Sequence, residues 1–166
     1  MPEKTLQEMM PLSEMLNREI PCTCGHVHRA DIDEVVIGRG ALEYVPELLR
    51  KHGYRTVFLL EDEQTHAAAG EALSALLVAE GFGVYAHMYL EDGWLAADEA
   101  AMQEGAAAFL SCQERPDVVI AIGSGTLNDL GKVIGTLVNV PQWAVATAAS
   151  MDGYASTAAA LVRNNL

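Results

Sequence analysis

The sequence predicts an α/β fold with an open, mostly parallel sheet and helices on both of its faces. Short apolar runs alternate with segments whose apolar residues recur every three or four positions, which is the βαβα order of such a sheet. The run "DVVIAIG" (117–123) is almost wholly apolar, as expected for a strand covered on both faces. Glycines at the junctions between these segments supply the turns that a parallel sheet needs.

The first half of the chain predicts three helices and two strands. Gly38 and Gly40 turn the chain between the first strand and its helix, and Gly53 ends that helix in the manner of a C-terminal glycine cap. In order, the predicted elements are an amphipathic helix over 4–18 that is kinked near Pro11, a strand over 33–38, a helix over 41–51, a strand over 55–61 and a helix over 64–80.

The second half continues the alternation. It predicts a strand over 82–90, an Ala-rich helix over 96–111, a strand over 117–123, a helix over 125–138 and a strand over 142–147. The final stretch "TAAALVRNNL" (157–166) predicts a further strand with a turn at Asn164 and Asn165. No hairpin partner follows this strand, so we expect the sequence to be truncated.

The length and composition indicate one compact unit. The 166 residues are 51% apolar and 20% charged, which is a globular balance. We divide them into a leader over 1–30, with the N-terminal helix and a Cys/His stretch, and an α/β domain over 31–166. Neither a signal peptide nor a run of about 18 apolar residues is present, so we expect a cytoplasmic protein without a membrane span.

The charge balance argues against some partners. Twenty-three acidic residues against ten Lys and Arg give a formal net charge of -13, which repels nucleic acid and anionic lipid surfaces. A small anionic ligand would therefore depend on backbone N–H groups at a helix terminus, because these act at contact distance.

The stretch "AIGSGTLNDLGK" (121–132) is the first candidate site. A buried strand ends at Gly123 and a helix begins almost at once, so that Gly123 and Gly125 let a ligand approach the backbone and the free N–H groups could bind a phosphate. The third glycine of the dinucleotide fingerprint is replaced by Asn128, and the P-loop pattern is absent. Connection geometry alone would also explain the glycines, and both interpretations stay open.

The stretch "ATAASMDGYAS" (146–156) is the second candidate site. It leaves the carboxyl end of the last strand beside the glycine turn, where ligands of open parallel sheets bind. Thr147 and Ser150 could hydrogen-bond a cofactor, and Asp152 could accept hydrogen bonds from substrate hydroxyls. From spacing alone, a turn that begins at Asp152 and Gly153 is the favoured interpretation.

Together, "GSGTLNDLGK" and "ATAASMDGYAS" resemble the sn-glycerol-1-phosphate dehydrogenase family, which is related to glycerol dehydrogenase and dehydroquinate synthase. The resemblance extends over "DEVVIGRGALEYVPELL", over "LEDEQTHAAAG" and to the last residue. It implies a Rossmann-like domain that binds NAD or NADP. By matching, it places the pyrophosphate at Gly125, Thr126, Leu127, Asn128 and Asp129, the rest of the cofactor at Thr147, Ala148, Ala149, Ser150 and Ser156, and the substrate at Asp152.

The reaction that the resemblance implies is hydride transfer between the nicotinamide and dihydroxyacetone phosphate, a small phosphorylated triose, with a divalent metal that polarises the carbonyl oxygen. The family's metal ligands, one Asp and two His, lie in a helical second domain beyond Leu166. The metal, whether zinc, nickel or iron, is therefore expected only in a full-length enzyme, and this chain alone is expected to be inactive. A homo-oligomer is compatible with the resemblance.

Three further groups of residues carry open alternatives. Cys22, Cys24, His26 and His28 of "CTCGHVH" are four soft metal ligands, but alternate residues do not easily converge on one tetrahedron, so a reduced surface turn is favoured over a metal site. Glu61 and Asp62 stand where dinucleotide folds hold an acid to the adenosine ribose, which would favour NAD, or else they belong to a solvated helix start with Asp62 or Thr65 as its cap. The residues His52, His66 and His87 have no partner that the sequence identifies.

Two other functions compete with this interpretation. One is a non-catalytic nucleotide or phosphometabolite binding module, in which the glycine turn binds a ligand and Asp152 is structural. The other is a glycerol or polyol dehydrogenase of the same fold.

Overall fold

A four-stranded parallel sheet forms the centre of the fold. In the computed structural model, which describes residues 14, 16–29, 31–90, 94–149 and 153–162, the strands lie in the order β4–β3–β5–β6. Their bounds are Thr56–Asp62 for β3, Gly83–Tyr89 for β4, Val118–Gly123 for β5 and Gln142–Ala146 for β6. These strands confirm the four predicted over the same stretches to within one residue at each end.

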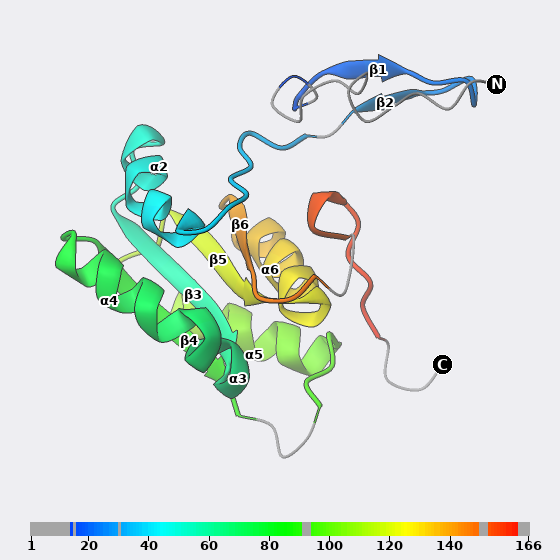
Figure 1. Cartoon of the computed structure of the whole chain (residues 1–166). Helices are drawn as coiled ribbons and strands as arrows, with labels where there is room; N and C mark the ends of the chain where they lie inside the picture. The colour runs from blue at the N-terminus through cyan, green and yellow to red at the C-terminus, as the bar shows by residue number, and fades with distance from the viewer. Residues whose placement is uncertain (1–13, 15, 30, 91–93, 150–152, 163–166) are drawn as a thin grey trace.

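Helices cover both faces of the sheet (Figure 1). The 3₁₀ turn η2 (Ala41–Tyr44), α2 (Val45–Lys51) and α4 (Glu71–Ala79) lie on one face, and α5 (Glu99–Leu110) and α6 (Gly125–Val138) lie on the other. The α/β class with helices on both faces is therefore confirmed. Among the described residues, no helix is both long and apolar enough to cross a membrane.

The four helices predicted after residue 40 are present; the first of them begins as the 3₁₀ turn η2, and two others differ from the prediction. Helix 96–111 begins later than predicted because the Asp98 side chain caps it, accepting a hydrogen bond from the Ala101 N–H at 2.9 Å. Helix 64–80 is interrupted: α3 (Glu63–Thr65) leads into a π-helical turn η3 (His66–Gly70) before α4 begins. A π-helical turn adds one residue to the helix. It changes the spacing of the apolar residues so little that the sequence pattern does not reveal the turn.

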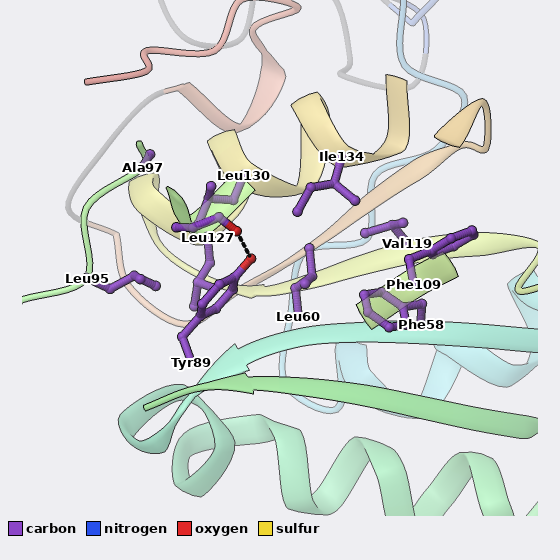
Figure 2. Packing of buried hydrophobic residues seen from close by; sticks show 11 residues of the cluster. Phe58, Leu60, Tyr89, Leu95, Ala97, Phe109, Val119, Leu127, Leu130 and Ile134 are labelled. Carbon is purple, nitrogen blue, oxygen red and sulfur yellow. Dashed lines mark hydrogen bonds between the residues drawn. The ribbon is translucent and has the colours of Figure 1, made fainter. Parts of the chain in front are cut away.

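Alternate residues of β3 belong to two separate cores. Val57 and Leu59 pack with Leu49, Leu73 and other apolar residues of the α2 and α4 face. Their neighbours along the strand, Phe58 and Leu60, lie in the second core with residues of α5 and α6; Figure 2 shows it with Tyr89, Phe109, Val119, Leu127, Leu130 and Ile134 around them. This period of two follows from the pleat of a strand that is buried on both faces.

A small antiparallel hairpin precedes the sheet. Strands β1 (Glu19–Pro21) and β2 (Val27–Arg29) pair Ile20 with His28, and Figure 1 shows the hairpin apart from the four-stranded sheet. Most of the predicted helix 4–18 lies outside the described residues. Its end is wrong, because Asn17 adopts a left-handed conformation (φ 54°) that stops a helix there.

Two predicted strands do not form. Residues 33–38 run without a ladder partner, and Ile37 is 82% exposed, because an apolar run forms a strand only where another strand supplies its hydrogen bonds. Residues 157–161 are also irregular, and only Val162 forms an isolated bridge, with Asp98. The predicted turn at Asn164 and Asn165 lies outside the described residues.

Candidate functional site

The strands β3 and β5 are neighbours whose following helices run to opposite faces of the sheet. After β3 the chain enters α4, whose Leu73 and Leu77 pack in the first core. After β5 it enters α6, whose Leu127 and Leu130 pack in the second core. Ligands of open α/β sheets bind outside the carboxyl ends of the strands at such a switch point. The candidate site is therefore the edge where β3 and β5 end.

The turn from β5 into α6 leaves backbone donors at this edge. The first hydrogen bond of the helix runs from the Asn128 N–H to the Ser124 carbonyl at 3.0 Å, so the N–H groups of the three preceding residues, 125–127, have no acceptor within the helix. A helix start with free N–H groups attracts anions. Close packing also requires Gly123, because a Cβ there would lie 2.6 Å from Leu127 Cδ1. Packing against Leu127 therefore accounts for a glycine at residue 123. The N–H groups of residues 125–127 could donate hydrogen bonds to a phosphate.

The end of β6 lies beside this turn, as predicted. Gly123 pairs with Ala146 in the parallel ladder, and the Thr147 N–H donates to the Gly123 carbonyl at 3.2 Å. Ala148 and Ala149 follow as exposed residues with no strand structure. Ser150 and Asp152 lie outside the described residues.

Tyr154 ties the two candidate stretches together. Its hydroxyl lies 3.0 Å from the Gly123 carbonyl oxygen and 2.9 Å from the Ala148 carbonyl oxygen, so it bridges the end of β5 and the chain after β6. A tyrosine hydroxyl is protonated at neutral pH and can donate, and burial raises the pKa of Tyr154 further above its ordinary value. The sequence interpretation missed this residue, since its role depends on two carbonyl groups that are distant along the chain.

The two acids at the end of β3 both have partners. Asp62 caps α3: its Oδ1 accepts from the Thr65 N–H at 2.7 Å, and the Thr65 hydroxyl accepts in return from the Asp62 N–H. Glu61 is 2% exposed, and its Oε1 lies 3.0 Å from His66 Nδ1. Thus His66, one of the histidines without an identified partner, lies against a buried carboxylate. The predicted cap is present, and a ribose contact would have to use the second oxygen of Asp62.

A family model described as iron-containing alcohol dehydrogenase matches residues 36–166. The chain belongs to this family. It is 33% identical over 148 residues to a glycerol-1-phosphate dehydrogenase (NAD(P)+) of Halalkalibacterium halodurans, and 30% identical over 164 residues to the enzyme of the same name from Geobacillus stearothermophilus. These alignments cover 87% and 96% of this chain but only 36% and 38% of the relatives. This member of the iron-containing alcohol dehydrogenase family thus spans less than half the length of those relatives.

Solved structures support the fold of this family member. The glycerol dehydrogenase of Schizosaccharomyces pombe matches with a TM-score of 0.56 at 20% identity, over 68% of this chain and 27% of that one. The maleylacetate reductase of Agrobacterium tumefaciens matches with a TM-score of 0.55 at 22% identity, over 68% and 30% of the two chains. At this level of identity the likeness shows a shared fold.

In this family member, one face of α6 holds the chain that follows β6. The Asn128 side chain, which is 1% exposed, reaches the Gly153 carbonyl at 3.4 Å. Lys132 Nζ donates to the carbonyl groups of Gly153 (2.8 Å) and Ala158 (3.1 Å), and Asp129 Oδ2 accepts from the Ala160 N–H at 3.1 Å. We call these three α6 side chains the α6 clamp. Ser156 lies within the held segment, where its Oγ accepts from the Ala158 N–H.

The α6 clamp changes how two predicted site residues are understood. Asn128 and Asp129 were matched to the pyrophosphate, and in the structure their side chains bind the protein's own backbone instead. Their backbone groups remain near the helix start, so a cofactor contact through them stays a prediction. The sequence interpretation missed the part played by Lys132, although its spacing of three residues from Asp129 is the signal that could have paired them.

Proposed function

We propose that residues 31–166 form the NAD(P)-binding portion of a glycerol-1-phosphate dehydrogenase. The full enzyme would interconvert dihydroxyacetone phosphate and sn-glycerol 1-phosphate by metal-assisted hydride transfer. The names of the relatives support the activity and the cofactor, and the match to the family supports an alcohol dehydrogenase. The observation that carries the proposal is the helix start of α6, with its free N–H groups, at the switch point between β3 and β5.

In this proposal the start of α6 binds the cofactor pyrophosphate. The N–H groups of Gly125, Thr126 and Leu127 donate to the phosphate oxygens, and the missing Cβ of Gly123 keeps the turn tight against α6. This local field acts at contact distance, so it can attract an anion although the formal net charge is -13.

The remaining contacts are assigned along the same edge. Asp62 Oδ2, which has no hydrogen-bond donor among the described residues, would accept from the adenosine ribose and so favour NAD over NADP. The stretch Thr147, Ala148, Ala149, Ser150 would line the cofactor, as would Ser156. Asp152 would accept hydrogen bonds from the hydroxyl groups of the triose phosphate.

The cofactor, when bound, supplies or accepts the hydride, and the chain described here orients it. The resemblance assigns the reaction's metal to one Asp and two His beyond Leu166. We therefore assign no residue of this chain as a ligand of that metal.

A charge placed at the helix start tests the proposal. Thr126→Asp adds a carboxylate where the pyrophosphate would bind, and Thr126→Asn has nearly the same shape without the charge. We expect NADH and NADPH, titrated by nicotinamide fluorescence, to bind the Asp variant roughly five- to tenfold more weakly than the Asn variant, which is about 1–1.4 kcal/mol. A carboxylate in the first turn favours the helix, so the unfolding midpoint of Thr126→Asp should not fall.

Equal affinity of the two variants would contradict pyrophosphate binding at this turn. If the chain binds phosphate or another nucleotide but neither NADH nor NADPH, a binding module without a redox cofactor would replace the proposal. A full-length enzyme that reduces dihydroxyacetone and ignores its phosphate would instead be a polyol dehydrogenase.

A further inference from the structure

The turn of the β1–β2 hairpin folds back on itself at Gly25. The Gly25 N–H donates to the Cys22 carbonyl at 3.1 Å, and the Cys22 N–H donates to the His26 carbonyl at 3.1 Å. Gly25 has a φ of 87°, which glycine adopts without the steric cost of a side chain. This turn carries Cys24 out of the extended line of the chain and back toward β2.

Three metal-ligating side chains converge there. The Sγ atoms of Cys22 and Cys24 and a ring nitrogen of His28 all lie within 4.8 Å of one another, and Cys24 Sγ is 3.1 Å from His28 Nε2. The expectation that alternate residues do not converge is therefore wrong for these three. His26, the fourth ligand type in the stretch, is not part of the cluster.

The cluster has the chemistry of a zinc site. Bond lengths of about 2.3 Å to sulfur and 2.0–2.1 Å to nitrogen put neighbouring ligand atoms of a tetrahedron about 3.5–3.8 Å apart. The distance of 3.1 Å from Cys24 Sγ to His28 Nε2 is a little shorter than this spacing, and every pair of the three ligand atoms lies within 4.8 Å. Two thiolates and an imidazole are soft ligands that select zinc over magnesium or calcium.

The thiols of the cluster are available to a metal ion, because a cysteine outside a disulfide can bind one as a thiolate. All three cysteines of the chain are free.

The hairpin has little else to hold it. Every described residue of 19–29 except Ile20 is exposed, so the hairpin buries almost no apolar surface. An isolated two-stranded hairpin is marginally stable in water. An ion bound to Cys22, Cys24 and His28 would cross-link the turn to β2 and supply the missing stability.

We propose that Cys22, Cys24 and His28 bind one zinc ion, with the fourth coordination position open to solvent. The ion fixes the β1–β2 hairpin. This site is independent of the proposed function, because none of its residues lies at the switch point between β3 and β5.

Metal content and cobalt spectra of the reduced 166-residue chain test the site. The variants are Cys24→Ser and His28→Asn, and the matched controls are Cys112→Ser, which removes the one cysteine outside the cluster, and His26→Asn, which removes the neighbouring histidine. We expect the wild type and both controls to bind one more zinc ion per chain than the two cluster variants do. Cobalt(II) added in place of zinc should give a thiolate-to-cobalt absorption band in the wild type and both controls that is weakened in Cys24→Ser and in His28→Asn.

Hydrogen exchange supplies a readout that does not depend on stoichiometry. Amides of residues 19–29 should exchange more slowly with zinc than after chelation in the wild type, and at equal rates in Cys24→Ser. The sheet should exchange alike in all variants, which shows that they fold. Equal zinc content in the wild type and Cys24→Ser, or equal loss from His26→Asn and His28→Asn, would overturn the site.

Discussion

Gly105 is a point of close contact between α5 and the rest of the second core. A Cβ on Gly105 would lie 2.3 Å from Tyr89 Oη and 2.6 Å from Ile134 Cδ1. The Tyr89 hydroxyl is itself fixed, since it donates to the Ala101 carbonyl at 2.9 Å, the hydrogen bond drawn in Figure 2. A methyl group at residue 105 would therefore force both the hydrogen-bonded Tyr89 ring and the end of the Ile134 side chain to shift.

We expect Gly105→Ala to lower the free energy of unfolding by about 1–3 kcal/mol. The sign is informative, because alanine is the better helix former by roughly 1 kcal/mol and would stabilise α5 if space allowed. Urea unfolding measures the change. Tyr89→Phe removes the atom nearest to the new methyl group, so in the double variant the two substitutions should cost less than their sum. A Gly105→Ala protein as stable as the wild type would show that α5 can move away from β4.

Individual residues also show what sequence alone can tell about the site. Gly123 and the start of α6 were predicted to the residue, because a buried strand that ends in glycines before an amphipathic helix leaves few alternatives. Tyr154 and Lys132 were not predicted to act there. Their partners are backbone carbonyl groups that only the folded chain brings near, and no side-chain pattern encodes such contacts.

At the scale of elements, the α6 clamp links a helix to an irregular segment. Residues 156–160 have no regular structure, and the preceding turn η4 (Gly153–Ala155) is a single 3₁₀ turn, so side chains of α6 supply several of their hydrogen bonds. The Lys132 side chain is 13% exposed, so its ammonium group is largely withdrawn from water. The position of this segment therefore depends on α6.

Lys132→Met keeps most of the stem of the side chain and removes the ammonium group. We expect residues 153–160 to exchange amide hydrogens faster and to be cut more readily by proteases, with a fall of about 1–3 kcal/mol in the free energy of unfolding. Lys51→Met is the matched control, because Lys51 forms an exposed ion pair with Glu34 on the other face and its loss should change stability little. Equal protection of the segment in the two variants would show that the α6 clamp does not hold it.

The elements that were wrongly predicted share a physical cause. Residues 33–38 and 157–161 have the apolar pattern of strands, yet a strand exists only where a partner accepts and donates its ladder hydrogen bonds. The β1–β2 hairpin and the π-helical turn were missed for the opposite reason. Both are set by local backbone geometry, at Gly25 and around His66 to Gly70, that leaves almost no trace in hydrophobic periodicity.

At the scale of the whole molecule, cofactor binding and catalysis should separate. The 166-residue chain covers 36% and 38% of two relatives, and the residues assigned to the reaction's metal are not among those described. We expect the chain to bind NADH or NADPH and to show no turnover of dihydroxyacetone phosphate with added zinc, nickel or iron. Nicotinamide absorbance follows the reaction, with a full-length relative as the positive control. Turnover by a chain whose mass is verified would contradict the assignment.

The burial of β3 on both faces limits how the sequence of this fold can evolve. Val57 and Leu59 face one core, while Phe58 and Leu60 face the other. A single inserted or deleted residue would therefore turn the following side chains of the strand to the wrong core. The exchange of one apolar side chain for another of similar volume changes the packing of only the core that this side chain faces. The length of this strand is therefore under stronger constraint than its composition, and gaps between related sequences should fall outside Thr56–Asp62.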